Sequence, residues 1–226
     1  MPLMYDPAKA VRHVRRRDPQ IRRIIDACGP LEIEARRGAF KSLGRAIFFQ
    51  QLAGPAARTI MTRVLTALST DEERWFEPHL MLQASDEALR AAGLSRQKIA
   101  YMRDLSDKFA SGELSEDDFE HLDDEDVIVR ASSVKGIGRW TAEMFLMFTL
   151  GRPDVLPVDD LGVRRGMQIT YGLDDMPKPD TMREIAEPWR PYRSAGTWYM
   201  WRALGVDLPE QGRGYKKPVD EKQYEI

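Results

Sequence analysis

The sequence predicts an all-α fold, and three observations support that prediction. Apolar residues recur at helical spacing in almost every segment of the 226-residue chain, a pattern typical of helices with one buried face. No segment alternates between polar and apolar residues as a half-buried strand does. Glycine and proline separate many of the periodic segments and mark where helices end. We therefore expect about ten helices, arranged in two lobes around a cleft.

The first four helices are expected in the N-terminal third of the chain. Residues 6–27 place apolar side chains near i, i+3 and i+4, as one buried helix face requires. Pro19 divides this segment into two helices, because proline is accepted in the first turn of a helix but not in its interior. The glycine and proline that follow Cys28 end the second helix. Residues 39–51 and 56–68 continue the amphipathic pattern.

Capping residues mark the helices that follow. Ser85 precedes a short helix that ends at Gly93, and Ser95 precedes one that runs to Phe109. Asp123 or the next residue, also an aspartate, caps the helix that leads into a glycine-containing turn, because short polar side chains accept hydrogen bonds from the first helical amides. The remaining helices are expected at residues 139–150, 160–171, 178–186 and 190–204.

These helices are expected to form one unit that spans residues 1–210. One lobe would combine residues 1–40 with residues 160–210, and the other would consist of residues 41–159. Residues 211–226 are polar and contain glycine and proline, so we expect a loose C-terminal tail.

The distribution of charge matters more than its total. The net charge is −2, which alone argues against a nucleic-acid partner. Nine acidic residues and no lysine or arginine lie between Glu113 and Asp126, so the rest of the chain carries a net charge of +7. Six arginines lie between Arg12 and Arg23. An acidic patch on one face is compatible with a cationic groove on another, although solvated charged surfaces would give the same pattern.

Several classes of protein are excluded by what the sequence contains. No apolar run reaches the roughly 18 to 20 residues of a membrane span, and the N-terminal segment is basic and helical rather than typical of a signal peptide. The single cysteine, Cys28, excludes an intrachain disulfide and a cysteine-ligated metal. The three histidines are scattered, so we expect chemistry without a catalytic transition metal.

A glycine-containing turn stands at residues 135–139, Lys-Gly-Ile-Gly-Arg. The two glycines permit positive φ and allow another backbone to come close. The helix that starts after them has first amides without an intrahelical partner, and together with the helix dipole these amides form an anion site that a DNA phosphate would fit. Lys135 and Arg139 would add charge without reading base sequence. A plain tight turn between antiparallel helices is the alternative.

Two adjacent carboxylates, Asp159 and Asp160, end the sequence Leu-Pro-Val-Asp-Asp and stand at the start of the next helix. Either could serve only as an N-cap. A carboxylate in a partly dry pocket could instead stabilise positive charge on a sugar during glycosidic cleavage.

These segments together resemble the helix-hairpin-helix DNA glycosylase superfamily. The resemblance rests on VKGIGRWTA at residues 134–142, LPVDD at 156–160 and IFFQQLA at 47–53, where Phe49 replaces the first glycine of the family's GQQLS segment. It covers about residues 8–204. Within the superfamily the chain is most similar to bacterial 3-methyladenine-DNA glycosylase II, which shares WTA after the hairpin, LPxDD and a PxRSxxxxYxW-like C-terminal helix. The residues of this chain open directly on an expected helix and show no match to the N-terminal β-containing domain of that relative, so a nearly all-α fold is expected.

The resemblance implies a role for each residue of a site. Asp160 is the implied catalytic residue, with Asp159 in support. Trp140 stands where strand-cutting members carry a lysine, which implies base excision without lyase chemistry. For substrate binding the family pattern implies Trp140 and Trp201 as pocket walls, Met144 in place of a pocket tyrosine, and Gln51 as the wedge that fills the vacated stack. For DNA binding it implies Lys135, Gly136, Ile137, Gly138, Arg139, Thr141 and Arg164, and for a Na⁺ or K⁺ ion the backbone carbonyls of Ser132, Val134 and Ile137.

The expected function is therefore a monofunctional DNA glycosylase that flips out and excises alkylated bases of the 3-methyladenine and 7-methylguanine type. Its expected partner is double-stranded DNA that contains such bases, with no membrane involved. The protein is expected to be a monomer in the cytoplasm, associated with the nucleoid when bound to DNA, and to need no catalytic cofactor. Two alternatives stay open: a non-catalytic helix-hairpin-helix DNA-binding module in which Asp160 is only a cap, and a glycosylase for another class of lesion.

Overall fold

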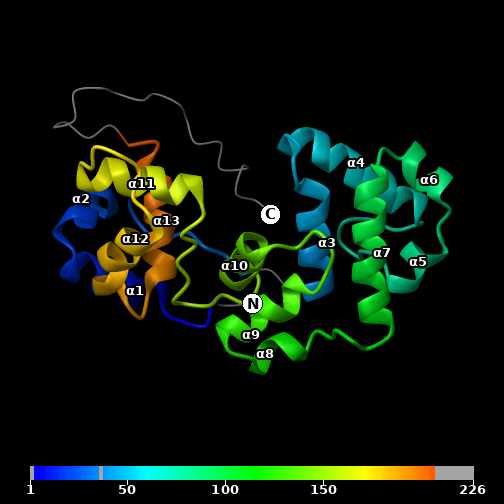
Figure 1. Cartoon of the computed structure of the whole chain (residues 1–226), viewed down its shortest axis with the longest axis horizontal. Coiled ribbons are helices and arrows are strands. Elements are labelled where there is room, and N and C mark those ends of the chain that lie inside the picture. Colours follow the sequence, from blue (N-terminus) through cyan, green and yellow to red (C-terminus); the bar gives the residue numbers. More distant parts are fainter. Residues whose placement is uncertain (1–2, 36–37, 207–226) are drawn as a thin grey trace. The chain divides into compact units, whose positions relative to one another are not determined.

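The computed structural model describes residues 3–35 and 38–206. These residues form thirteen α-helices and one 3₁₀ helix, and they include no strand (Figure 1). The predicted all-α fold is confirmed. The predicted C-terminal tail, residues 211–226, lies outside the described residues. Within them, no helix combines the length and the apolar character that a membrane crossing requires.

The described chain divides into two compact units. The first consists of residues 3–35 and 146–206, and the second of residues 38–145. The sequence-based division placed the boundaries near residues 40 and 160, whereas the contacts divide the chain after Ala35 and after Phe145. The second boundary therefore falls inside α10 (Arg139–Phe148) rather than in the loop that follows this helix.

The first unit is built around its last helix, α13. Nine of the eleven residues of α13 are buried, and α1, α2 and α11 all pack against it. A Cβ atom at Gly166 in α11 would lie 2.0 Å from the carbonyl oxygen of Met200, so the backbones of α11 and α13 meet without a side chain between them. The helices of this unit are α1 (Pro7–Arg17), α2 (Pro19–Cys28), α11 (Leu161–Tyr171), α12 (Pro179–Ala186), the 3₁₀ helix η1 (Glu187–Trp189) and α13 (Arg193–Ala203).

The second unit has α3 and α7 at its centre, with α4, α5 and α6 packed around them. Nine of the eleven residues of α3 are buried, as expected for a central helix. The helices of this unit are α3 (Ala39–Phe49), α4 (Gly54–Ala67), α5 (Pro78–Gln83), α6 (Asp86–Ala91), α7 (Arg96–Ala110), α8 (Asp118–His121), α9 (Asp124–Ser132) and the first part of α10.

The predicted caps are confirmed. Ser85 accepts a hydrogen bond from the Ala88 amide, Ser95 from the Lys98 amide and Asp123 from the Asp126 amide. Pro19 is the first residue of α2, where its missing N–H costs nothing. Three helices that the sequence analysis did not list are short: α5, α8 and η1 have six, four and three residues, too few for a periodic pattern to be recognised.

Carboxylates of the acidic stretch from residue 113 to 126 make specific contacts within the second unit. Helix α3 begins after Gly38, which has no side chain with which to cap it. Glu116 supplies the missing acceptor and takes the amides of Ala39 and Phe40. Asp118 accepts the Ser115 amide at 2.7 Å and pairs with Arg130. These carboxylates thus satisfy helix N-termini and basic side chains instead of forming a purely solvated face.

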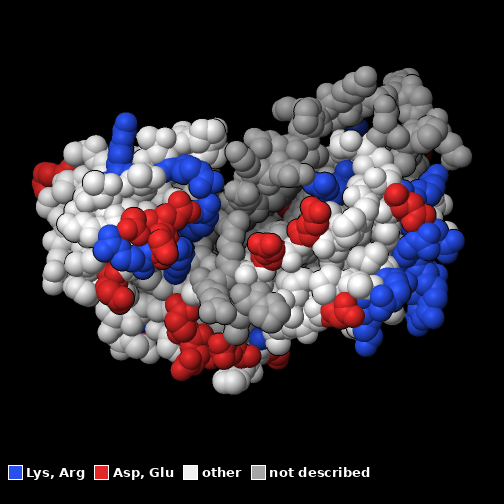
Figure 2. Space-filling model, turned by 180° about the vertical axis from the view of Figure 1, so that it is seen from behind, with Lys and Arg blue, Asp and Glu red and all other residues white. Residues whose placement is uncertain are grey.

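Basic side chains gather elsewhere. Figure 2 shows lysine and arginine side chains grouped over the end of this face where α1 and α2 lie. Arg12, Arg16 and Arg17 are exposed there, and Arg15 is held by Asp26 at 2.7 Å. The hydrogen bond from Arg15 holds the pKa of the Asp26 carboxyl below its usual range. The first unit therefore carries a local positive surface although the whole chain is slightly acidic.

Candidate functional site

Asp160 is buried at the N-terminus of α11, whereas its neighbour Asp159 is exposed. The Oδ1 atom of Asp160 accepts the Val163 amide at 2.7 Å, which makes Asp160 the N-cap of α11. The same oxygen accepts the indole Nε1–H of Trp201 at 2.9 Å. Asp160 is thus a cap and also the acceptor of a buried side-chain hydrogen bond, and its side chain is held in one orientation.

Trp201 lies on α13 and is only 3% exposed. Its ring stacks on Phe148, with ring centroids 5.8 Å apart and an interplanar angle of 26°. The sequence suggested Trp201 as a pocket wall but gave no sign of its hydrogen bond to Asp160. The structure brings Trp201 and Asp160 together within the first unit.

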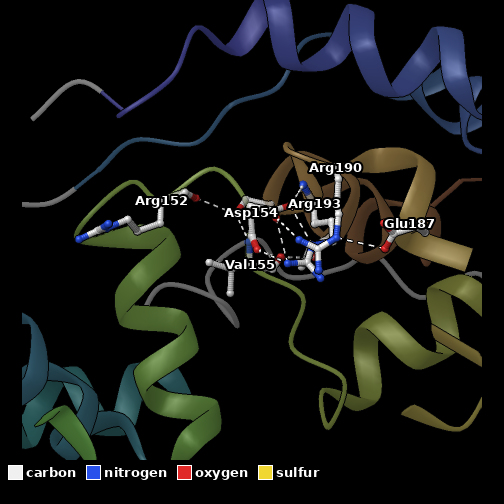
Figure 3. A network of polar contacts seen from close by, with 8 residues as sticks. Arg152, Asp154, Val155, Glu187, Arg190 and Arg193 are labelled. Atoms are coloured by element: carbon white, nitrogen blue, oxygen red, sulfur yellow. Dashed lines mark hydrogen bonds and ion pairs between the residues drawn. The ribbon is translucent and has the colours of Figure 1, made fainter. Parts of the chain in front are cut away.

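The loop that leads to Asp160 is fixed by ion pairs at its beginning (Figure 3). Asp154 accepts Nε of Arg193 at 2.8 Å and Nη1 of Arg190 at 2.8 Å. The backbone carbonyl of Asp154 also accepts Nη2 of Arg193 at 2.9 Å. Asp154 and Arg193 are mostly shielded from solvent, so this network is stronger than an ordinary surface pair. Sequence reasoning placed Arg193 in the PxRSxxxxYxW-like motif without giving it a role, and it did not single out Asp154.

The far end of α11 is fixed by a second buried carboxylate, Asp18. Its Oδ2 accepts the hydroxyl of Tyr171 and, at 2.8 Å, the indole Nε1–H of Trp189. Its Oδ1 caps α2 by accepting two amides. Burial beside Asp18 raises the pKa of the Tyr171 hydroxyl well above its usual value, so this group stays a donor. Helix α11 therefore has a buried carboxylate at each end.

The glycine-containing turn lies in the second unit, and its two glycines differ. Gly136 has φ +84°, and a Cβ atom there would lie 2.2 Å from the ring of Tyr101. Gly138 lacks positive φ, and a Cβ atom there would meet nothing within 4 Å. The prediction that both glycines permit positive φ and a close backbone is therefore wrong for Gly138. At Gly136 the close neighbour is an aromatic ring instead of another backbone.

The two basic residues of the turn contact carboxylates. Lys135 pairs with Asp104 at 3.2 Å through Nζ, and its amide donates to the same carboxylate. Arg139 donates two hydrogen bonds to Glu125, at 3.0 and 2.5 Å, and one to Glu143 at 3.2 Å. The hydrogen bonds from Arg139 hold the pKa of Glu125 below its usual range.

The other predicted DNA-binding residues have varied surroundings. Thr141 and Ile137 are buried. The Nε–H of Arg164, in the first unit, donates to the Pro177 carbonyl at 3.1 Å. For the predicted ion site, the Val134 carbonyl already accepts the Ile137 amide at 3.0 Å. In the part of the chain that the structure describes, no group of three or more His, Cys, Asp or Glu side chains could hold a metal ion. The alkali-ion site at Ser132, Val134 and Ile137 stays a prediction.

The turn between α3 and α4 contains the predicted wedge. Gln51 is exposed and has φ +56°, a backbone conformation that is uncommon for a residue with a side chain. The side chain of Gln50 donates to the Gly136 carbonyl at 2.8 Å, which ties this turn to the glycine turn. Lys98 donates to the Phe48 carbonyl at 2.6 Å, and burial lowers the pKa of Lys98. Sequence reasoning missed the roles of Gln50 and Lys98.

The predicted base-binding residues belong to different units. Trp140 is 37% exposed and Met144 is buried, both in the second unit. Trp201 belongs to the first. The common pocket that the resemblance implied for them therefore stays a prediction.

Comparisons with known proteins agree with the resemblance seen in the sequence. Residues 45–191 match the family described as HhH-GPD superfamily base excision DNA repair protein. The chain is 30% identical over 220 residues to DNA-3-methyladenine glycosylase 1 of Schizosaccharomyces pombe, which covers 96% of this chain and 93% of that protein. It is 30% identical over 205 residues to DNA-3-methyladenine glycosylase of Saccharomyces cerevisiae, which covers 74% and 67%.

Two solved structures are similar over most of their length. A DNA-3-methyladenine glycosidase from Bacillus halodurans matches with a TM-score of 0.79 and 34% identity, over 90% of this chain and 92% of that one. A 3-methyladenine DNA glycosylase of Schizosaccharomyces pombe in complex with abasic DNA matches with a TM-score of 0.75 and 31% identity, over 88% and 97%.

Proposed function

This chain belongs to the HhH-GPD superfamily of base excision DNA repair proteins, and on that premise we propose that it is a DNA glycosylase that excises alkylated bases. The bond cleaved is the N-glycosidic bond between an alkylated base, such as 3-methyladenine or 7-methylguanine, and its deoxyribose. Support comes from the relatives named above, all of which are glycosylases or glycosidases of 3-methyladenine. The substrate is damaged double-stranded DNA.

The observation that carries the proposal is the orientation of the buried carboxylate of Asp160. Cleavage of an N-glycosidic bond builds positive charge on the sugar ring, and an ionised carboxylate fixed in a water-poor site stabilises that charge without reorganising. The Val163 amide and the Trp201 indole fix the Oδ1 atom of Asp160 before substrate arrives. An alkylated base that already carries positive charge is a good leaving group, so no strong general acid is needed.

Excision is proposed to leave an abasic site with an uncut strand. Lyase chemistry in this superfamily needs a lysine just after the hairpin to form a Schiff base with the sugar, and this chain carries Trp140 at that position. The glycine turn and the N-terminus of α10 are proposed to bind phosphate, with the exposed Lys135 side chain adding charge. The site of action is proposed to be nucleoid DNA in the cytoplasm.

Base release from methylated DNA tests the proposal. Duplex DNA treated with a radioactive methylating agent would be incubated with excess native protein or with Asp160→Asn, and released bases would be identified by chromatography. A defined duplex with one 7-methylguanine would be analysed with and without alkali. We expect release of methylated bases, strand breaks only after alkali, and a loss of at least about a hundredfold in the variant.

Other outcomes point to the alternatives. DNA binding without release by either protein would favour the non-catalytic binding module. Strand breaks without alkali would contradict the monofunctional mechanism. Equal rates for native protein and Asp160→Asn would remove Asp160 from catalysis.

A further inference from the structure

The loop from Gly151 to Asp159 lies along one edge of α13. Its first contact is Ser194, which is buried. The Ser194 hydroxyl donates to the Arg152 carbonyl at 2.7 Å and accepts the Val155 amide at 3.0 Å. The Ser194 amide donates to the Pro153 carbonyl at 2.9 Å. One serine therefore satisfies three backbone groups of the loop. The ion pairs of Asp154, shown in Figure 3, hold the same part of the loop.

The second contact is Thr197, one turn further along α13. Thr197 is fully buried, and its hydroxyl donates to the Val155 carbonyl at 3.1 Å. Another turn further, Trp201 donates to Asp160 at 2.9 Å. Positions 194, 197 and 201 have the i, i+3, i+7 spacing of one helix face. Three side chains from one stripe of α13 thus hold the loop at its beginning and at its end.

The connection between these anchors is short and stiff. Only four residues separate Val155 from Asp160, and Leu156, Pro157 and Val158 among them are buried. Pro157 has a fixed φ, and its carbonyl accepts the Asp160 amide at 3.1 Å. A shift of the backbone at Val155 is therefore transmitted to Asp160 instead of being absorbed in between.

We infer that Ser194 and Thr197 are positioning residues for the Asp160 carboxylate, an inference that rests on the function proposed above. Their hydroxyls place the loop backbone so that Asp160 meets both the Val163 amide and the Trp201 indole. Without either hydroxyl a buried backbone group of the loop loses its partner and the loop shifts toward solvent or a new contact. The fold survives such a shift, but the catalytic geometry does not.

Thr197→Val tests the inference because it removes the hydroxyl and keeps the shape of the side chain. Thr197→Ser restores the hydroxyl. Thr170→Val is the matched control: Thr170 is 1% exposed and lies on α11 in the same unit, but its Oγ1 has no hydrogen-bond partner. Ser194→Ala is the second test variant.

The readouts are the excision rate at saturating protein, the half-saturating concentration for DNA and the thermal midpoint, with rates compared at an equal interval below each midpoint. We expect Thr197→Val and Ser194→Ala to lower the saturated rate by about tenfold to a hundredfold, the loss typical of small misplacements. The half-saturating concentration should stay at the native value. Thr197→Ser should recover most of the rate, and Thr170→Val should leave it native.

Two results would overturn the inference while the proposed function stands. The first is an excision rate of Thr197→Val equal to that of Thr170→Val. The second is a raised half-saturating concentration in Thr197→Val together with a native saturated rate. If the native protein releases no methylated base, the proposed function itself fails, and the inference fails with it.

Discussion

Gly166 is the position where one added methyl group is expected to disturb both stability and the orientation of Asp160. In Gly166→Ala the new Cβ would lie 2.0 Å from the carbonyl oxygen of Met200, 2.6 Å from its carbonyl carbon and 2.9 Å from its Cα. All three atoms belong to the backbone of α13, so no side chain can turn aside. Helices α11 and α13 must separate instead.

The required separation can be worked out from these distances. Ordinary contact begins near 3.4 Å, so the helices must move apart by roughly 1.4 Å or tilt by an equivalent amount. A shift of this size would lengthen the Trp201–Asp160 bond, now 2.9 Å, beyond the length of a useful hydrogen bond. Overpacking of this kind costs about 1–3 kcal/mol, which corresponds to a fall of roughly 2–12 °C in the thermal midpoint for a chain of this size.

Thermal unfolding followed by circular dichroism, with single-turnover base release on the same samples, measures both effects. Gly54→Ala is the matched control, because a Cβ atom at this first residue of α4 would meet nothing within 4 Å. We expect a native midpoint and rate for the control, and a lower midpoint with at least about tenfold slower release for Gly166→Ala. A Gly166→Ala protein with native midpoint and native rate would refute the reasoning that the backbone contact sets the position of Asp160.

Three further predictions concern the second unit. Gly136→Ala should weaken DNA binding by at least about tenfold, because strain at positive φ adds to the clash with Tyr101. Fluorescence anisotropy measures the DNA affinity, and a native affinity in the variant would contradict the prediction. Glu125→Gln should free Arg139 to contact a phosphate and so raise the DNA affinity. The slope of the logarithm of the binding constant against the logarithm of the salt concentration should steepen by about 0.9. An unchanged slope would show that Arg139 stays away from DNA. Because the pKa of Glu125 is lowered, its ion pair with Arg139 is complete above the ordinary carboxyl pKa and is lost as pH falls through the lowered pKa. The difference in DNA affinity between native protein and Glu125→Gln should therefore shrink at low pH. Gln50→Ala should slow base release about tenfold with a nearly native thermal midpoint, because the turn between α3 and α4 loses its hydrogen bond to the Gly136 carbonyl. A native rate of base release would argue against coupling between this turn and the glycine-containing turn.

Features that are local in the sequence could be predicted from it. Ser95 and Asp123 cap helices through amides three residues ahead, and this chemistry is visible in a short window. The cap of α3 could not be predicted, because Glu116 lies 77 residues from the Ala39 amide that it accepts. No periodic pattern in the sequence predicts this hydrogen bond, and only the folded second unit brings Glu116 and the Ala39 amide together.

The candidate site shows the same division. The glycine turn and Asp160 stand out in the sequence because their spacing matches a family pattern. The bond between Trp201 and Asp160 spans 41 residues, and those from Ser194 and Thr197 to the loop span 39 to 42. These bonds depend on how the loop before α11 and the N-terminus of α11 pack against α13. Gly138 shows that a local pattern can also mislead. Its residue type suggested a turn with positive φ, which the backbone does not adopt.

The bonds to Asp18 have a consequence for the order in which the protein is made. Tyr171 follows Asp18 by 153 residues and Trp189 follows it by 171. At typical rates of translation a ribosome needs roughly ten to thirty seconds to cover that interval. During this time α1 and α2 can pack on each other but lack their contacts with α11, η1 and α13. Residues 38–145, a continuous stretch, can already complete their own unit. Helices α1 and α2 are thus synthesised well before the residues that complete their native contacts, and chaperones that bind nascent chains have long access to these two helices.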